Sequence, residues 1–157
     1  ALAVALLEAN GFTREDFALS HPGGSLGKRL LLTVDDLMHT GADLPRVDDN
    51  ATLAEALLEM TAKGLGMTAV VDGDDHLVGI FTDGDLRRML MQEVNVRTQK
   101  VTGVMTTQPV TIAAGQLAAA ALQLMESRKI NGLFVVDASR RPLGAINMHD
   151  LLRAGVV

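Results

Sequence analysis

Two short motifs carry the side chains best suited to hold a ligand. Each places a carboxylate three positions after a polar residue, Thr82 before Asp85 and Asn147 before Asp150. A carboxylate in the first turn of a helix can accept the paired hydroxyls of a ribose, and the free N–H groups of that turn favour a phosphate. The same spacing is a common helix start in which the acid only caps the helix. Nucleotide contact and plain capping therefore both stay open.

Several basic side chains are expected near these motifs. They are Arg87, Arg88, Lys129 and His149. Such groups would meet a phosphate or a sugar carboxylate, although residues of this kind are usually solvated surface charges. Both roles are kept as alternatives.

The elements that must position these residues occur twice. Residues 60–72 read MTAKGLGMTAVVD, and residues 125–137, 65 positions later, read MESRKINGLFVVD. Apolar periodicity and turn signals predict a strand, a helix, two strands and a helix in each copy. Helices are expected over 53–63, 82–91, 115–127 and 148–153, and strands over 45–47, 67–71, 77–81, 109–112, 133–136 and 143–147. A lone three-stranded sheet is marginal, so the copies should pack together with a pseudo-symmetric cleft between them.

Composition excludes several classes of function. The 157-residue chain has a net charge of −5 and no basic run, which argues against nucleic acid as a partner. No stretch approaches the roughly eighteen apolar residues of a membrane span, and no secretory signal is recognisable, so we expect a cytoplasmic protein without a membrane partner. The lack of cysteine excludes disulfides and thiol catalysis. No acid/base or nucleophile constellation is complete, so the chain by itself is not expected to be an enzyme.

Three further patterns predict no site. The loop over residues 23–29 is rich in glycine, but its spacing is not that of a phosphate-binding loop. Residues 72–75 read DGDD, lack the spacing and distal Glu of an EF-hand, and predict a hairpin turn. His39 and His76 show no i, i+4 pairing, so no metal site is predicted.

Short motifs flank the two copies: Asp36-Leu37-Met38 and Gly103-Val104-Met105-Thr106 ahead of them, and a Gly-x-x-Thr-x-x-Asp ending over residues 79–85. With these motifs the repeat resembles a pair of cystathionine-β-synthase-type (CBS) domains. The second ending departs from this pattern because Asn147 replaces Thr. The resemblance implies an α/β (α+β) fold of two tandem β-α-β-β-α repeats packed as a pseudo-twofold pair. Their bounds would be 33–92 and 93–157, after a tail and linker over 1–32.

The resemblance also implies where a base would lie. In CBS pairs the base usually rests against the backbone of the lead strand and of the first core strand. One site would then use Val47, Met67 and Thr68, and the other would use Thr111, Asn131 and Gly132. Ordinary strand packing is the alternative role of each of these residues.

A second resemblance rests on four segments, residues 17–28, 37–41, 80–88 and 148–155. These segments are similar to D-arabinose 5-phosphate isomerases. The first resembles the end of a sugar isomerase (SIS) domain, where His21 matches an active-site histidine of that family. The resemblance implies a parent enzyme that interconverts ribulose 5-phosphate and arabinose 5-phosphate for the Kdo sugar of lipopolysaccharide. Since the chain opens inside an apolar run, we expect a piece of such a protein in which His21 lacks its catalytic partners.

Two hypotheses for function follow. In the first, the pair is a regulatory module that senses a nucleotide or nucleotide-sugar, either AMP or the pathway end product CMP-Kdo, and requires no other cofactor. In the second, it is a structural dimerisation module with a vestigial cleft. The paired apolar faces favour a homodimer, and the parent protein would be a tetramer.

Overall fold

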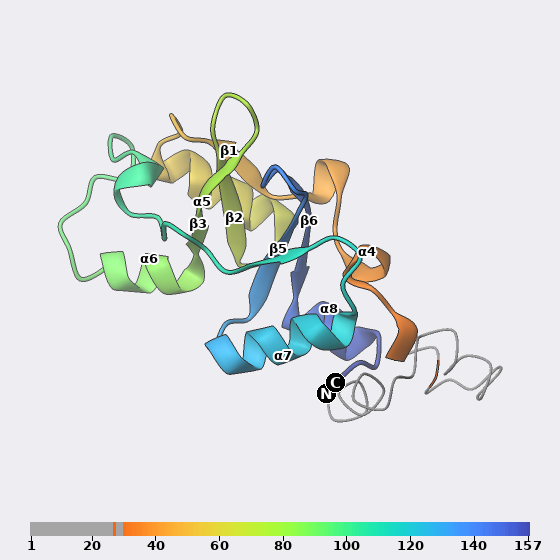
Figure 1. The fold of residues 1–157 in the computed structure, drawn as a ribbon. Helices are drawn as coiled ribbons and strands as arrows, with labels where there is room; N and C mark the ends of the chain where they lie inside the picture. The colour runs from red at the N-terminus through yellow and green to blue at the C-terminus, as the bar shows by residue number, and fades with distance from the viewer. Residues whose placement is uncertain (1–26, 28–29) are drawn as a thin grey trace.

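The computed structural model describes Gly27 and residues 30–157 (Figure 1). The elements in chain order are α4 (Val34–Leu37), the 3₁₀ turn η1 (Gly41–Asp43), β1 (Arg46–Asp48), α5 (Leu53–Lys63), β2 (Met67–Val71), β3 (Leu77–Thr82), α6 (Asp83–Met89), the 3₁₀ turn η2 (Val101–Gly103), β4 (Thr111–Ala113), α7 (Ala118–Arg128), β5 (Gly132–Val136), β6 (Pro142–Asn147) and α8 (Met148–Arg153). We call β1 to α6 the first copy and β4 to α8 the second copy.

The two copies share one topology and one register. Each has a three-stranded sheet in sequence order, with a parallel first pair and an antiparallel second pair. Arg46 lies opposite Ala69, and Thr111, 65 positions later, lies opposite Phe134. Both hairpins also carry an irregularity at the same place, after Val70 and after Val135. The predicted mixed fold of two tandem β-α-β-β-α repeats is confirmed.

Local capping defines the ends of α5, the first helix of the first copy. The Thr52 hydroxyl accepts a hydrogen bond from the Glu55 backbone N–H at 3.3 Å, and the Glu55 carboxylate accepts one from the Thr52 N–H at 3.2 Å. The helix ends at Gly64, which has a φ of 69° in the left-handed region where glycine is favoured. The predicted range of 53–63 is therefore confirmed.

The second copy begins later than the sequence predicted. Helix α7 starts at residue 118 rather than 115, because Gly115 has a φ of 84° and Leu117 is extended at the N-cap. The lead strand β4 occupies 111–113 rather than 109–112. Gln108 has a φ of 52° just ahead of Pro109, so the chain turns there and pairs with β5 only from Thr111.

The segments that lead into the copies are exchanged. We call residues 33–39 the first strap and residues 101–106 the second strap. The first strap pairs with the second copy, since the backbones of His39 and Ala145 exchange two hydrogen bonds of 2.8 and 3.0 Å. The second strap pairs with the first copy, where Thr106 and Ile80 do the same at 2.8 and 3.0 Å. Each copy is thus completed by the strap that precedes the other.

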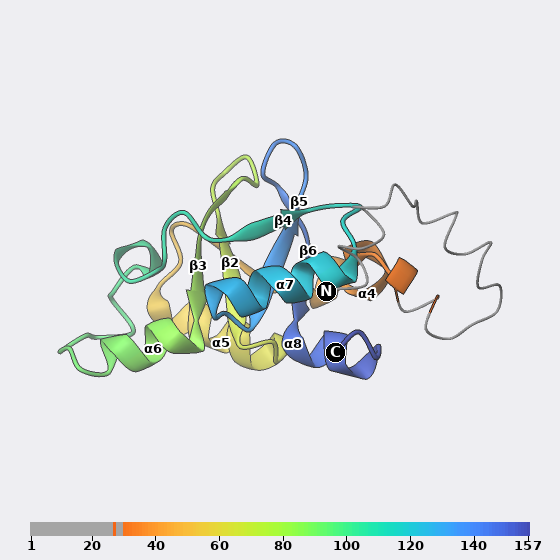
Figure 2. The same ribbon diagram turned by 60° about the horizontal axis from the view of Figure 1, so that its bottom comes forward.

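Buried side chains join the copies into one core. A central cluster combines residues of both sheets with the chain ahead of β1: Leu44, Met67, Ala69, Val71, Leu77, Phe134, Val136 and Ala145. Two flanking clusters lie within single copies, and Val34 and Val101 of the straps are fully buried in them. In Figure 2 helices α5 to α8 lie along the lower side, and the two hairpin turns lie at the upper side.

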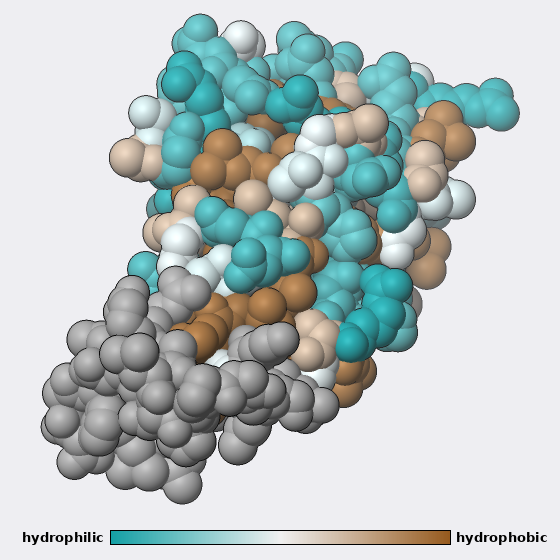
Figure 3. Space-filling view, turned by 90° about the vertical axis from the view of Figure 1, so that its right-hand side faces the viewer, coloured by the Kyte–Doolittle hydropathy of each residue, from teal (hydrophilic) through white to brown (hydrophobic). Residues whose placement is uncertain are grey.

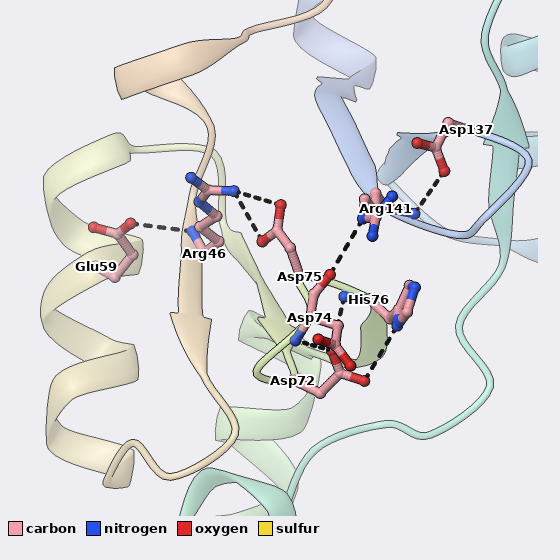
Figure 4. A network of polar contacts seen from close by, with 8 residues as sticks. All are labelled: Arg46, Glu59, Asp72, Asp74, Asp75, His76, Asp137 and Arg141. Atoms are coloured by element: carbon pink, nitrogen blue, oxygen red, sulfur yellow. Dashed lines mark hydrogen bonds and ion pairs between the residues drawn. The ribbon is translucent and has the colours of Figure 1, made fainter.

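The two hairpin turns also meet each other (Figure 4). The Arg141 guanidinium donates from Nε to the Asp74 carbonyl at 3.2 Å, and the Leu77 N–H donates to the Arg140 carbonyl at 2.9 Å. Contacts between the copies therefore run from the central cluster to the turns.

The outer surface is mixed in polarity. Figure 3 shows hydrophobic residues as separate patches between hydrophilic ones on the side that lies to the right in Figure 1. Among the described residues, none of the helices is both long and apolar enough to cross a bilayer.

Candidate functional site

A cleft of about 430 Å³ opens between the two copies, beside the second strap. Its wall combines the start of β2, the junction of β3 and α6, the strap and chain leading into β4, and the turn between α7 and β5. The lining residues are Leu65, Gly66, Met67, Ile80, Thr82, Asp83, Gly84, Arg87, Arg88, Thr106, Gln108, Pro109, Val110, Lys129, Ile130, Asn131 and Gly132. Every one of these segments must be in place before the cleft exists.

The cleft gathers many of the residues that the sequence singled out. They are Met67, Thr82, Arg87, Arg88, Lys129, Asn131 and Gly132. The sequence placed Met67 in one site and Asn131 and Gly132 in another. The structure brings them together, because the starts of β2 and β5 face each other and a side chain on Gly132 would touch the Met67 sulfur.

The remaining candidate residues lie elsewhere. Thr68 is fully buried and its hydroxyl donates to the Ala69 carbonyl at 3.2 Å. Val47 packs against the first copy's core, and Thr111 lies in β4 outside the cleft lining. Asn147, Asp150 and His149 stand at the corresponding end of the second copy, with His149 exposed. His21 lies outside the described residues.

Asp85 is buried beneath the cleft and is heavily hydrogen-bonded. Its Oδ2 accepts bonds from the N–H and the hydroxyl of Thr82 at 3.0 and 3.1 Å. Its Oδ1 accepts the Thr106 hydroxyl at 2.8 Å and is paired with the Arg88 guanidinium. The Asp85 side chain is only 5% exposed, whereas that of Arg88 is 70% exposed. Asp85 therefore caps α6, as one of the two alternatives from the sequence predicts, and it also anchors three groups of the cleft wall. Nucleotide contact stays a prediction.

Asp150 occupies the matching position in the second copy. Its Oδ2 accepts the Asn147 N–H at 2.9 Å, and the Asn147 side chain accepts the Asp150 N–H at 2.9 Å. Its Oδ1 contacts His39 Nε2 at 2.8 Å and Arg153 at 3.1 Å. Asn thus builds the same cap as Thr, and the buried network is reproduced with His39 in the place of Thr106.

Sequence reasoning missed two polar residues of the cleft, Thr106 and Gln108. A signal for Thr106 was present, because it follows Met105 as His39 follows Met38 in the paired motifs. That pair is offset by 67 positions instead of 65, since the connection into β1 is two residues longer than the one into β4. Because of this different offset, the repeat alignment did not show that Thr106 and His39 occupy equivalent positions.

Two non-glycine residues of the cleft hold left-handed backbone conformations. Lys129 has a φ of 56° at the end of α7, where the first copy has Gly64 with a φ of 69°. Gln108 has a φ of 52°, and its counterpart in the first connection is Gly41 with a φ of 59°. A side chain in this region costs about 1–2 kcal/mol relative to a right-handed conformation. Asp75 and Arg140 hold the same conformation in the two hairpin turns, with φ values of 66° and 62°.

Replacing Lys129 by Gly should raise the free energy of unfolding by about 0.5–1 kcal/mol, because glycine relieves the left-handed strain at some cost in chain entropy. Urea denaturation measures the change. The matched control is Gly64→Lys, which introduces the same strain in the first copy and should lower stability by a similar amount. A Lys129→Gly variant less stable than the parent chain would show that Lys129 is held there by a stabilising contact.

The DGDD turn brings ligand-type atoms together outside the cleft (Figure 4). Oxygen or nitrogen atoms of Asp72, Asp74 and His76 lie within 4.8 Å of one another. The Asp72 carboxylate accepts the backbone N–H groups of His76 and Asp74, each at 2.9 Å, and these bonds, the His76 one foremost, lower the pKa of Asp72. Asp72 and His76 do contact each other at i, i+4, at 3.5 Å, which the sequence prediction overlooked.

The second copy builds the same turn around Asp137, but its side chains do not form a set of possible metal ligands. The Asp137 carboxylate accepts the N–H groups of Ser139 and Arg141 at 2.8 and 2.9 Å. Because Arg141 cannot ligate a cation, turn formation accounts for the arrangement in both copies. The predicted hairpin turn is confirmed.

Comparison with known proteins identifies the repeated unit. The family model described as CBS domain matches residues 34–92 and 101–157. The chain is also 60% identical over all 157 residues to arabinose 5-phosphate isomerase KdsD of Pseudomonas aeruginosa, of which it covers 48%. It therefore spans about half the length of that relative.

Solved structures share the fold. CBSX2, whose crystal structure is a complex with AMP, is 25% identical and superposes with a TM-score of 0.67 over 80% of this chain and 96% of its own. A CBS-domain-containing protein of Agrobacterium tumefaciens is 23% identical, with a TM-score of 0.69 over 80% of this chain and 95% of its own. With both copies matched by the family model and the tandem fold reproduced in these structures, the chain belongs to the CBS-domain family as a CBS domain pair.

Proposed function

We propose that this CBS pair is a regulatory module that binds a nucleotide or nucleotide-sugar in the cleft between its copies. The observation that carries the proposal is the placement of positive charge on both sides of the cleft. Arg87 comes from α6 of the first copy, and Lys129 from the end of α7 in the second. Within the described part of the chain, neither side chain has an ion-pair partner, so both are available to an anionic ligand.

The rest of the cleft suits a nucleoside. Leu65, Ile80, Val110 and Ile130 supply aliphatic surface for a base in a chain with few aromatic residues. Asp83 offers an exposed carboxylate with no ion-pair partner in the described structure, and we assign it to the ribose hydroxyls.

In this proposal Asp85 takes part mainly by positioning Thr82, Thr106 and Arg88, since its oxygens already accept their hydrogen bonds. Arg88 is mostly exposed, so it can turn from Asp85 to a ligand anion while a ligand hydroxyl takes its place. Asn131 and the backbone of Gly132 complete the polar wall of the cleft.

The relatives suggest the protein in which the module works. Because the chain matches about half of an arabinose 5-phosphate isomerase at 60% identity, we propose that the whole protein is such an enzyme. It would interconvert ribulose 5-phosphate and arabinose 5-phosphate in the cytoplasm, for Kdo and lipopolysaccharide synthesis. His21 would belong to the isomerase site.

Two effectors are the leading candidates. CMP-Kdo is the activated end product of that pathway and carries a ribose, a phosphate and a carboxylate. Its two anionic groups match the cations on opposite sides of the cleft. AMP is the second candidate, because CBSX2, a CBS protein of the same fold, is seen in complex with AMP.

Regulation requires that the ligand prefer one arrangement of the protein over another. A ligand held by both copies also touches the second strap, because Thr106 lines the cleft. Drawing Arg87 and Lys129 together would therefore change the contacts between the copies. We propose that this change reaches the isomerase through the first strap.

We also propose that the module is a homodimer and that the parent enzyme is a tetramer. Large exposed hydrophobic side chains are found on or just after the helices: Leu58 (71%), Leu90 (70%), Met91 (89%) and Leu152 (52%). These helices lie on the lower side in Figure 2, opposite the hairpin turns, and that side would be the natural interface.

Calorimetric titration of the 157-residue chain with CMP-Kdo, AMP and CMP tests the ligand assignment. We expect saturable binding, and at least about tenfold weaker binding for Arg87→Ala, equivalent to about 1.4 kcal/mol. Arg128→Ala is the matched control, because it removes the same charge from an exposed residue outside the cleft lining. Heat with AMP alone would reject CMP-Kdo as the effector.

The alternative, a structural dimerisation module with a vestigial cleft, predicts no binding. A ligand at 100 times its dissociation constant stabilises the folded state by about 2.7 kcal/mol, which would raise the melting temperature by several degrees. No shift with either CMP-Kdo or AMP, in a chain that light scattering shows to be a dimer, would favour the alternative.

A further inference from the structure

One position in each strap contacts the buried acid of a copy. In the second strap it is Thr106, whose hydroxyl donates to Asp85 Oδ1 at 2.8 Å. In the first strap it is His39, whose Nε2 contacts Asp150 Oδ1 at 2.8 Å. Both residues also pair through their backbones with equivalent strands, Thr106 with Ile80 and His39 with Ala145. Geometrically they are the same site with side chains of different size.

The size difference coincides with a difference in exposure, because Ile80 is half-buried and lines the cleft whereas Ala145, at the equivalent position, is fully buried. Thr106 lines the cleft of about 430 Å³, because its short side chain ends at the Asp85 carboxylate. The imidazole of His39 must extend over the corresponding region to reach Asp150, and the His39 side chain is 29% exposed. Behind each of them a methionine of the strap, Met105 or Met38, covers a glycine of the adjacent strand in the same way.

The chemistry of the two regions differs as well. Residues of the open cleft have counterparts 65 positions later or earlier. Asp83 corresponds to Met148, Arg87 to Leu152 and Lys129 to Gly64. At these three positions the corresponding residue has no charged side chain, whereas His149 stands in the place of Gly84 and Arg153 keeps the place of Arg88.

We propose that the residue following the strap methionine determines which of the two pseudo-symmetric clefts admits a ligand. Thr106 leaves the first cleft open, and His39 fills the second by bonding to Asp150. The pair therefore has one ligand site instead of two. For the nature of the ligand this inference rests on the proposed function, but its geometric part does not.

The absence of cysteine from the chain allows a test without a ligand. Ile80→Cys places a thiol in the open cleft, and Ala145→Cys places one at the equivalent, fully buried position under His39. The rate of modification by methyl methanethiosulfonate is followed by mass spectrometry. A thiol in a filled region reacts only when the region opens locally, so we expect the Ile80→Cys variant to react at least about tenfold faster.

Exchanging the strap residues should exchange the rates. Adding His39→Thr to Ala145→Cys is expected to accelerate its modification by about tenfold, because the imidazole no longer fills the cleft. Adding Thr106→His to Ile80→Cys is expected to slow its modification by a similar factor. Thr106→Ser and His39→Asn serve as controls for changing these positions, and urea denaturation verifies that each variant is folded. If Thr106→His does not fold, the His39→Thr arm still decides.

Equal rates for the two thiols, or rates indifferent to both exchanges, would overturn the inference. Titrations with CMP-Kdo and AMP separate it from the proposed function. Exchanged rates without any ligand binding would leave the inference standing and reject the proposed function. Binding of two ligands per chain to the protein in which His39 is unchanged would support the proposed function and reject the single open cleft.

Discussion

Replacing Phe134 by Ala is expected to lower the free energy of unfolding by about 3–5 kcal/mol, the usual cost of removing a fully buried aromatic ring. Phe134 is 1% exposed at the centre of β5. Its ring belongs to the central cluster, which contains Met67 and Leu77 of the first copy and Ala145 of the second. A cavity there removes contacts on both sides of the pseudo-twofold axis.

The same variant tests whether the copies fold as one unit. Because the cluster is shared, urea should unfold the Phe134→Ala variant in a single transition, displaced to lower concentration and with an unchanged slope. Leu58→Ala is the matched control, since Leu58 is 71% exposed and its truncation should change stability by no more than about 0.5 kcal/mol. Two separated transitions, with only one of them displaced, would mean that the copies fold independently.

Replacing Asp85 by Ala is expected to lower the free energy of unfolding by about 2–4 kcal/mol and to abolish ligand binding. The change leaves the Thr82 N–H and the Thr106 hydroxyl without their acceptor in a region where Asp85 is 5% exposed. Both donors belong to half-buried residues, and a donor that loses its acceptor in such a place costs up to about 1–3 kcal/mol. The Arg88 pair adds little to stability because that side chain is largely in water.

Asp83→Ala separates the two effects. Asp83 is exposed and lines the cleft, so its loss should change stability by no more than about 0.5 kcal/mol while weakening the binding of CMP-Kdo or AMP. Urea denaturation and calorimetry on both variants supply the comparison. Equal stability of the Asp85→Ala and Asp83→Ala variants would contradict the role given to the buried network.

Much of the fold could be predicted from local chemistry. The range of α5 followed from Thr52 as cap and Gly64 as stop, and the strands β2 and β5 followed from short apolar runs. Because the two copies are offset by 65 residues, the strands of the second copy pair in the same register as those of the first. The predicted start of α7 was wrong, because the Ala-rich run outweighed the helix-breaking signal of Gly115, and the residue type of Leu117 does not mark it as extended.

The site was only partly predictable. Its charged and capping residues could be named because each belongs to a short motif, as Thr82, Arg87 and Arg88 do. The sequence could not show that Met67 and Asn131 share a cleft, since they lie in different copies and meet only across the packed sheets. It also could not rank Asp83 above Asp85 as the accessible acid, because burial depends on what packs over a helix.

The sequence by itself determined the two copies, their elements and the acids that cap α6 and α8, because these depend on side chains close together in the chain. Only the tertiary structure decided that the straps cross to the opposite copies. The free energy of that exchange comes from burying Val34 and Val101 in distant cores. The crossing sets Thr106 against Asp85 and His39 against Asp150, so the difference between the clefts arises from contacts that span the whole chain.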